Sequence, residues 1–195
     1  MTKKSLVLIL SASMLFNSQN VLLADETKDA QELAENNSVS SRLAANARKY
    51  LNIEYKFGGR LTQRNPGIDC MGLIFLAYSK TTGIGWNNIS VNPSEIVKKK
   101  ELGMPVLGLD GILCRDVDAG KLEEGDIIYL LSRVQIKDEP LANIKGVSYW
   151  PWHMGLYSDK RHNLFLEANP IYGVKEHSFN DILKDNEAIF VTRIH

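Results

Sequence analysis

The order of helix-like and strand-like segments along the chain restricts its fold more than any other feature. An apolar run with helical character covers residues 70–82 and ends at Gly83, and a shorter helix is expected from Ser40 or Ser41 to about residue 51. Segments typical of strands come only later, at residues 126–131, 152–158, 164–168, 173–177 and 188–194. Helices followed by strands predict an α+β domain in which N-terminal helices pack on an antiparallel β-sheet.

The connecting segments have fewer regular signals. Gly58-Gly59 and Pro66-Gly67 mark residues 56–67 as a loop. Residues 86–120 are irregular in pattern and rich in glycine and proline, with one short helix expected at 94–100. Another short helix is expected to begin at residues 181–183, before the last strand.

The N-terminal segment has the features of an export signal. Lys3 and Lys4 precede an apolar stretch at residues 6–16, which is too short to span a bilayer, and Ala24 supplies a small residue for cleavage. We therefore expect a signal peptide at 1–24, a flexible linker at 25–41 and one domain at 42–195. The protein is then secreted or periplasmic, with no stable membrane insertion after cleavage. An uncleaved N-terminal anchor is the alternative.

The charge balance does not favour a nucleic-acid partner. The chain has 23 basic and 23 acidic side chains, and removal of residues 1–24 takes away two lysines and no acid. The remaining 21 basic and 23 acidic groups give a net charge of about −2. Nucleic-acid-binding domains instead carry clustered positive charge.

Cys70 is the leading candidate for a reactive group. It follows the turn Gly67-Ile68-Asp69 at the start of the expected helix, where unpaired N–H groups and the helix dipole favour a thiolate. His153 and Glu167 lie in two of the strand-like segments. A cysteine, a histidine and a polar orienting residue are the parts of a cysteine hydrolase.

The second cysteine and the remaining histidines have simpler interpretations. Cys114 lies in an apolar segment and is expected to be a buried small residue, although a Cys70–Cys114 disulfide is the alternative for a secreted protein. His162, His177 and His195 are expected to be ordinary surface or turn residues. No cluster has metal-ligand spacing, so neither a metal nor a cofactor is expected.

Four short motifs in order resemble those of the NlpC-type cell-wall peptidases, a papain-like family of cysteine hydrolases. They are YKFGG at 55–59, DCMGL at 69–73, LEEGDIIY at 122–129 and HMGLY at 153–157. The resemblance covers about residues 42–194 and implies a papain-like form of the α+β fold.

The resemblance also implies residue roles. Cys70 would be the nucleophile, His153 the general base and Glu167 the residue that orients the histidine. Tyr55 would line the site, and Asp69 would contact the free amine of the substrate. The implied partner is a peptidoglycan stem peptide, cut at the amide between D-glutamate and the diamino acid.

Two departures from the family pattern leave alternatives open. Met71 stands where the family usually has serine, and residues 132–150 lengthen the segment before His153, with Trp152 in an aromatic cluster that lines or covers the cleft. One alternative is that the same triad acts on a lipid or protein amide or thioester. The other is that the chain is an inactive module that binds the wall or a partner. Asn169 is the alternative to Glu167 as orienting residue, because strand alternation puts both on one face.

Overall fold

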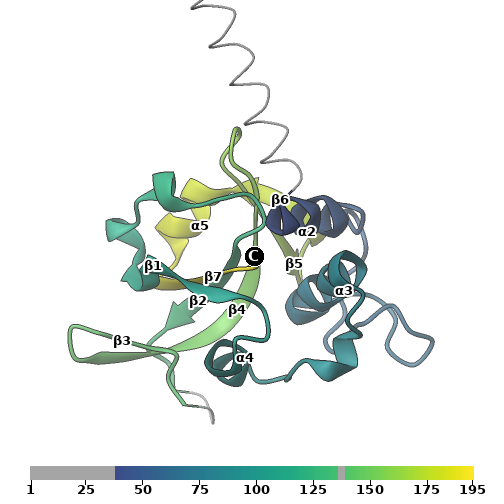
Figure 1. Ribbon diagram of the computed structural model, residues 1–195, viewed down its shortest axis with the longest axis horizontal. Coiled ribbons are helices and arrows are strands. Elements are labelled where there is room, and N and C mark those ends of the chain that lie inside the picture. The colour runs from purple at the N-terminus through teal and green to yellow at the C-terminus, as the bar shows by residue number, and fades with distance from the viewer. Residues whose placement is uncertain (1–37, 136–138) are drawn as a thin grey trace, which may run out of the picture. The chain divides into compact units, whose positions relative to one another are not determined.

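The described part of the chain is built around one antiparallel sheet (Figure 1). The computed structural model describes residues 38–135 and 139–195, of which Val39–His195 form one compact unit. The strands pair in the order β1-β7-β2-β4-β5-β6, and β3 pairs with the first part of β4. Their bounds are β1 Met104–Leu113, β2 Ile127–Ser132, β3 Ala142–Ile144, β4 Val147–Asp159, β5 Leu164–Asn169, β6 Gly173–Ser178 and β7 Ala188–Arg193.

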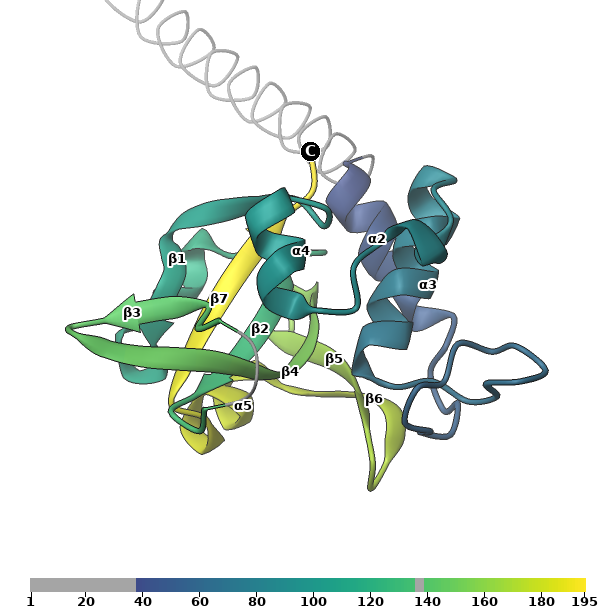
Figure 2. The ribbon, with the colours of Figure 1, turned by 90° about the horizontal axis from the view of Figure 1, so that it is seen from below.

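Helices cover both faces of this sheet. Helices α2 and α3 lie side by side and contact β4, and α3 also contacts β5 (Figure 2). Helix α5 packs against β5 and β6. The helical segments are α2 Val39–Arg48, α3 Cys70–Thr82, α4 Pro93–Lys99 and α5 Phe179–Asp185, with short 3₁₀ turns η1 Trp86–Asn88, η2 Cys114–Asp116 and η3 Ala119–Lys121.

The central strand β2 shows why the sheet needs a cover on each side. Ile127 and Tyr129 belong to the hydrophobic cluster that includes α2 and α3. Ile128 and Leu130 belong to a second cluster that includes Phe179 of α5. Successive side chains of a strand point to opposite faces, so an uninterrupted apolar run requires burial on both. The α+β architecture predicted from the sequence is therefore confirmed.

The structure corrects the predicted strands in two places. The segment 86–120, expected to be irregular apart from one short helix, contains β1, which pairs with β7. Gly108 and Gly111 have φ of 79° and 110° and accompany register shifts in β1, so the strand lacks a regular alternating pattern. The insertion at 132–150 contributes β3, which extends the sheet as a hairpin with β4.

The helix predictions differ from the structure mainly at their ends. Helix α3 has the predicted bounds, and Gly83 takes the left-handed conformation of a C-terminal cap, with φ of 78°. Helix α2 begins at Val39 and ends at Arg48, so the predicted domain boundary at 42 falls inside it. The predicted signal peptide at 1–24 and most of the linker at 25–41 lie outside the described residues. Within the described residues, no helix is both long and apolar enough to cross a bilayer.

A β-bulge lies next to His153. Leu130 pairs with His153 and Leu131 pairs with Pro151, so Trp152 has no partner on β2. A bulge of this kind changes the direction of the neighbouring side chains and accommodates a proline within a strand. The rings of Trp152 and His153 stack, with centroids 5.3 Å apart and an angle of 28° between their planes.

Candidate active site

Cys70 is the first residue of α3 and is half-buried. Asp69 caps the helix by accepting a hydrogen bond from the backbone N–H of Gly72 at 2.6 Å. The backbone N–H groups of the first helical turn and the helix dipole therefore surround the thiol with partial positive charge. This is the environment in which a protein favours a thiolate nucleophile.

Gly72 allows the loop before the helix to pack against this first turn. A Cβ atom at Gly72 would lie 2.2 Å from the carbonyl oxygen of Gly59 and 2.9 Å from Nη1 of Arg60. Both distances are too short for real atoms, so a side chain here would push the loop away. The glycine of the DCMGL motif thus has a packing reason that the sequence alone does not reveal.

His153, from β4, connects the thiol with a carboxylate. Its Nε2 lies 2.5 Å from Oε2 of Glu167, and the side chains are only 8% and 6% exposed. Cys70 is a further side-chain hydrogen-bond partner of the ring. Burial lowers the pKa of His153, but the hydrogen bonds to Cys70 and Glu167 and their negative charges outweigh it and raise the pKa to about 9.

Glu167, from β5, is held as a carboxylate. Burial raises its pKa, but the hydrogen bond and charge of His153, the charge of His177 and the hydrogen bond from Asn169 together lower it below the ordinary value. Asn169 donates from Nδ2 to Oε1 of Glu167 at 3.2 Å. Of the two candidates for the residue that contacts His153, the structure therefore places Glu167 there. Asn169 instead donates a hydrogen bond to the carboxylate of Glu167.

His177 is the residue of this cluster that the sequence did not indicate. It was expected to be an ordinary surface residue, yet its Nε2 lies 3.4 Å from Oε1 of Glu167. Phe165 pairs with His177 and Glu167 pairs with Lys175, so Glu167 and His177 are diagonal neighbours on one face. His177 is two residues after Lys175, so both side chains lie on the same face of the strand. The sequence shows this spacing, but it indicates a contact with Glu167 only when the β5–β6 register is known.

The remaining predicted site residues line a pocket beside Cys70. The pocket has a volume of about 320 Å³, at the lower end of the range for ligand sites. Burial raises the pKa of Tyr55, and the negative charges of Cys70 and Asp69 raise it further, so the phenol stays protonated. The predicted substrate-binding residues Tyr55, Asp69, Met71 and Trp152 all belong to its wall.

A larger hollow of about 670 Å³ lies around Cys114, Arg133 and Glu187. Burial raises the pKa of Cys114 to about 12, and the charge of Glu187 acts in the same direction. Cys114 and Cys70 are both free thiols, so the structure does not contain the alternative Cys70–Cys114 disulfide. The smaller pocket is the candidate site, because it alone of these two contains a nucleophile next to a base.

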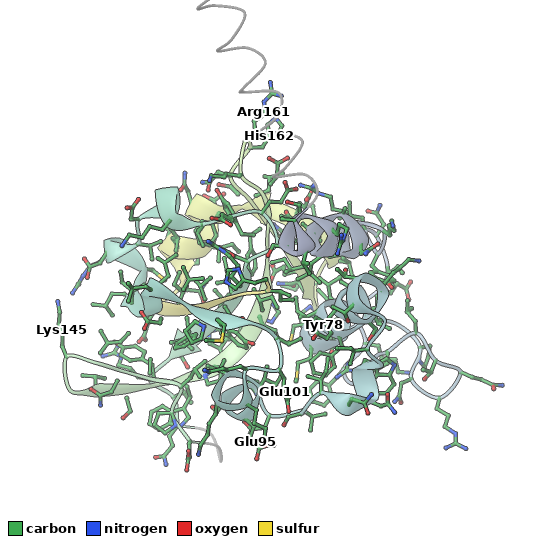
Figure 3. All side chains as sticks on the ribbon, viewed as in Figure 1. Tyr78, Glu95, Glu101, Lys145, Arg161 and His162 are labelled. Carbon is green, nitrogen blue, oxygen red and sulfur yellow. The ribbon has the colours of Figure 1, made fainter. Side chains whose placement is uncertain are left out.

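Other groups that the sequence left open lie outside this cluster. His162 bonds to Asp159 and projects at the tip of the β4–β5 turn beside Arg161 (Figure 3). Among residues 38–135 and 139–195, no group of three or more His, Cys, Asp or Glu side chains is arranged to hold a metal ion.

Comparison with known proteins finds a likeness to solved structures. No protein-family model matches the chain, and no curated protein matches it. A crystal structure from Staphylococcus aureus subsp. aureus Mu50, described as similar to a lipoprotein of the NLP/P60 family, has 19% sequence identity and a TM-score of 0.48. The match covers 82% of this chain and 42% of that chain, so this chain spans less than half of the length of its structural neighbour.

Proposed function

We propose that this protein is a cysteine hydrolase that cleaves an amide bond. The observation that carries the proposal is the series Cys70–His153–Glu167, in which a thiol at a helix N-terminus, an imidazole and a carboxylate are hydrogen-bonded in sequence. The raised pKa of His153 and the lowered pKa of Glu167 favour a thiolate–imidazolium pair beside a carboxylate at neutral pH.

The chemistry follows from these positions. The Cys70 thiolate attacks the amide carbonyl, forming an S–C bond and a tetrahedral oxyanion. Backbone N–H groups at the start of α3 stabilise this oxyanion, an effect worth roughly 3–4 kcal/mol per donor in related sites. His153 then gives its proton to the leaving nitrogen as the C–N bond breaks. His153, now neutral, then takes a proton from water as the water oxygen bonds to the acyl carbon. The S–C bond breaks, which releases the acid and restores the thiolate–imidazolium pair.

Glu167 and Tyr55 have supporting roles in this scheme. Glu167 fixes the ring of His153 through Nε2 and stabilises its charged form. Tyr55 keeps its proton and lines the pocket, so it is available as a hydrogen-bond donor to substrate.

The four sequence motifs support an NlpC-type enzyme, and the N-terminal segment with Lys3 and Lys4 supports export to the cell envelope. On that proposal the target is a peptidoglycan stem peptide, cut between D-glutamate and the diamino acid, and the chain has its signal peptide removed. The alternative substrate, a different amide or a thioester, is favoured by Met71, which forms part of the pocket wall in place of the usual serine.

Two measurements on the purified protein test the class and the substrate separately. The first compares the rates at which iodoacetamide labels Cys70 and Cys114, by peptide mass spectrometry. We expect Cys70 to react at least 100-fold faster, because Cys114 is buried and its pKa is about 12. Equal and slow labelling would refute the hydrolase and favour a binding module.

The second measurement is mass spectrometry of purified muropeptides incubated with the protein or with Cys70→Ala. Fragments split after D-glutamate that are absent with the variant would support the stem-peptide target. If Cys70 labels rapidly and no muropeptide is cut, the enzyme class stands and the stem-peptide target is wrong.

A further inference from the structure

The carboxylate that the motif resemblance assigns to a substrate amine is already occupied. Both oxygens of Asp69 accept hydrogen bonds: Oδ1 from the N–H of Gly72 and from Nη1 of Arg60 at 2.5 Å, and Oδ2 from the N–H of Gly58 at 2.8 Å. Asp69 is 6% exposed and Arg60 is 8% exposed. The negative charge of Asp69 is therefore neutralised inside the protein.

Arg60 is held in this position by further contacts. Its Nη1 also donates to the carbonyl oxygen of Gly59 at 2.7 Å, and its guanidinium lies over the ring of Phe75, 5.3 Å from the centroid. Separating a buried, hydrogen-bonded ion pair leaves an uncompensated charge, which is strongly unfavourable. A substrate ammonium at Asp69 would have to displace Arg60 or lie beside its positive charge.

Apart from Tyr55 and the catalytic pair Cys70 and His153, the side chains of the remaining pocket wall are apolar. Met71, Pro151 and Met154 contribute to its wall. Phe57 and Val91 also line it, yet they are 88% and 73% exposed. Large apolar side chains left in water at the edge of a pocket are typical of a surface that a ligand covers.

Of the described residues that line the pocket, Asp69 is the only carboxylate, and Arg60 compensates it. We propose that the acyl group presented to Cys70 is neutral and apolar, with no free ammonium. This inference rests on the proposed hydrolase function and specifies the acyl side of its substrate. Because the D-glutamate of a stem peptide carries a free carboxylate, the inference favours the alternative amide or thioester over the stem-peptide target. A straight aliphatic chain and an N-blocked apolar amino acid share this chemistry.

Matched chloromethyl ketones test the inference without requiring a particular leaving group. The Cys70 thiolate displaces chloride from such a reagent, so an S–C bond forms as the C–Cl bond breaks. The neutral reagents are 1-chlorononan-2-one and the chloromethyl ketone of acetyl-phenylalanine. Each is compared with a counterpart that differs by one ammonium group on the acyl side, and each rate of Cys70 modification is divided by the rate with iodoacetamide.

We expect at least one neutral reagent to modify Cys70 tenfold or more faster than its charged counterpart. The pair with the larger preference identifies an aliphatic or a peptide-like acyl source. Equal rates within both pairs, or faster reaction of the charged reagents, would overturn the inference while rapid iodoacetamide labelling leaves the hydrolase intact. Slow labelling of Cys70 by iodoacetamide itself would reject the hydrolase function and the inference with it.

Variants connect the preference with the residues that carry it. In Arg60→Gln the charge of Asp69 is uncompensated, so the preference for neutral reagents should fall at least fivefold. Phe57→Ala and Val91→Ala alter exposed side chains and should fold normally while slowing the neutral reagents threefold or more. Leu107→Ala, equally exposed on β1, is the matched control and should change nothing. Unchanged selectivity in Phe57→Ala and Val91→Ala would contradict the apolar subsite even if Arg60→Gln failed to fold.

Discussion

Nε2 of His177 lies 3.4 Å from Oε1 of Glu167, while His153 bonds to the other carboxylate oxygen, Oε2. The two histidines come from β6 and β4, the neighbours of the β5 strand that carries Glu167. Gly155 pairs with Glu167, so His153, two residues earlier, is diagonal to the carboxylate in the same way as His177. The carboxylate thus lies between two imidazoles supplied by the sheet register.

His177 should act as a positioning residue for Glu167. Tyr172 packs against its ring at 5.8 Å between centroids, and the ammonium of Lys175 lies over Tyr172. In His177→Gln the pKa of Glu167 should rise, because the charge of His177 helps to lower it. We expect a few-fold lower kcat/KM at neutral pH and an acidic limb of the pH–rate profile displaced to higher pH.

His162→Gln is the matched control, since His162 bonds to Asp159 in a turn and has no contact with the cluster. Its pH–rate profile should equal that of the parent protein. A parallel loss of rate at every pH in His177→Gln would indicate a merely structural effect and would refute the positioning role.

Loss of charge at Glu167 should be more damaging than loss of either supporting group. Glu167→Gln keeps the size of the side chain but removes the anion that raises the pKa of His153. We expect kcat/KM to fall roughly 10²-fold or more, as in other triads that lose their acidic member. The alkaline limb of the pH–rate profile should move to lower pH.

Asn169→Ala should lower kcat/KM only a few-fold, because it removes one hydrogen bond to Oε1 of Glu167. Similar losses in the two variants would show that the charge of Glu167 is not what matters.

The sequence was most informative where function and local structure depend on the same residues. A turn followed by an apolar helical run locates Cys70 and Asp69, and the bounds of α3 follow from Gly83. β1 was missed because Gly108 and Gly111 interrupt the alternation that identifies a strand, and pairing with β7 supplies what local propensity lacks.

The parts of the site that the sequence did not reveal all depend on tertiary contacts. Arg60 is nine residues before Asp69, and its burial against Phe75 follows only from the packing of the loop on α3. His177 reaches Glu167 through the β5–β6 register, which no local pattern determines. The bulge at Trp152 likewise needs the register between β2 and β4.

Gly72→Ala should damage the site through the loop that packs on α3. The new Cβ would overlap the carbonyl oxygen of Gly59 and press on Arg60, so the loop must move. Overpacking of this kind costs about 1–3 kcal/mol, which outweighs the higher helix propensity of alanine. Urea unfolding should show this loss, and iodoacetamide should label Cys70 more slowly. Lys80→Ala, on the exposed surface of the same helix, should unfold like the parent protein. An increase in stability in Gly72→Ala would mean that the loop does not approach the helix as described.

The His153–Glu167 pair should give stability a definite pH dependence. The pKa of His153 is raised from 6.5 to about 9, so its contribution is fully present below about pH 6.5 and is lost as pH rises through 9. The pKa of Glu167 is lowered from 4.5, so its contribution is present above about pH 4.5 and is lost as pH falls through the depressed value. The free-energy difference between the parent protein and His153→Gln, measured by urea unfolding, should therefore be largest near pH 5–6.5 and shrink above pH 9. The rate should fall over the same alkaline range, because neutral His153 cannot protonate the leaving nitrogen. A difference that stays constant from pH 6 to 10 would contradict the charged state of His153 on which the proposed mechanism depends.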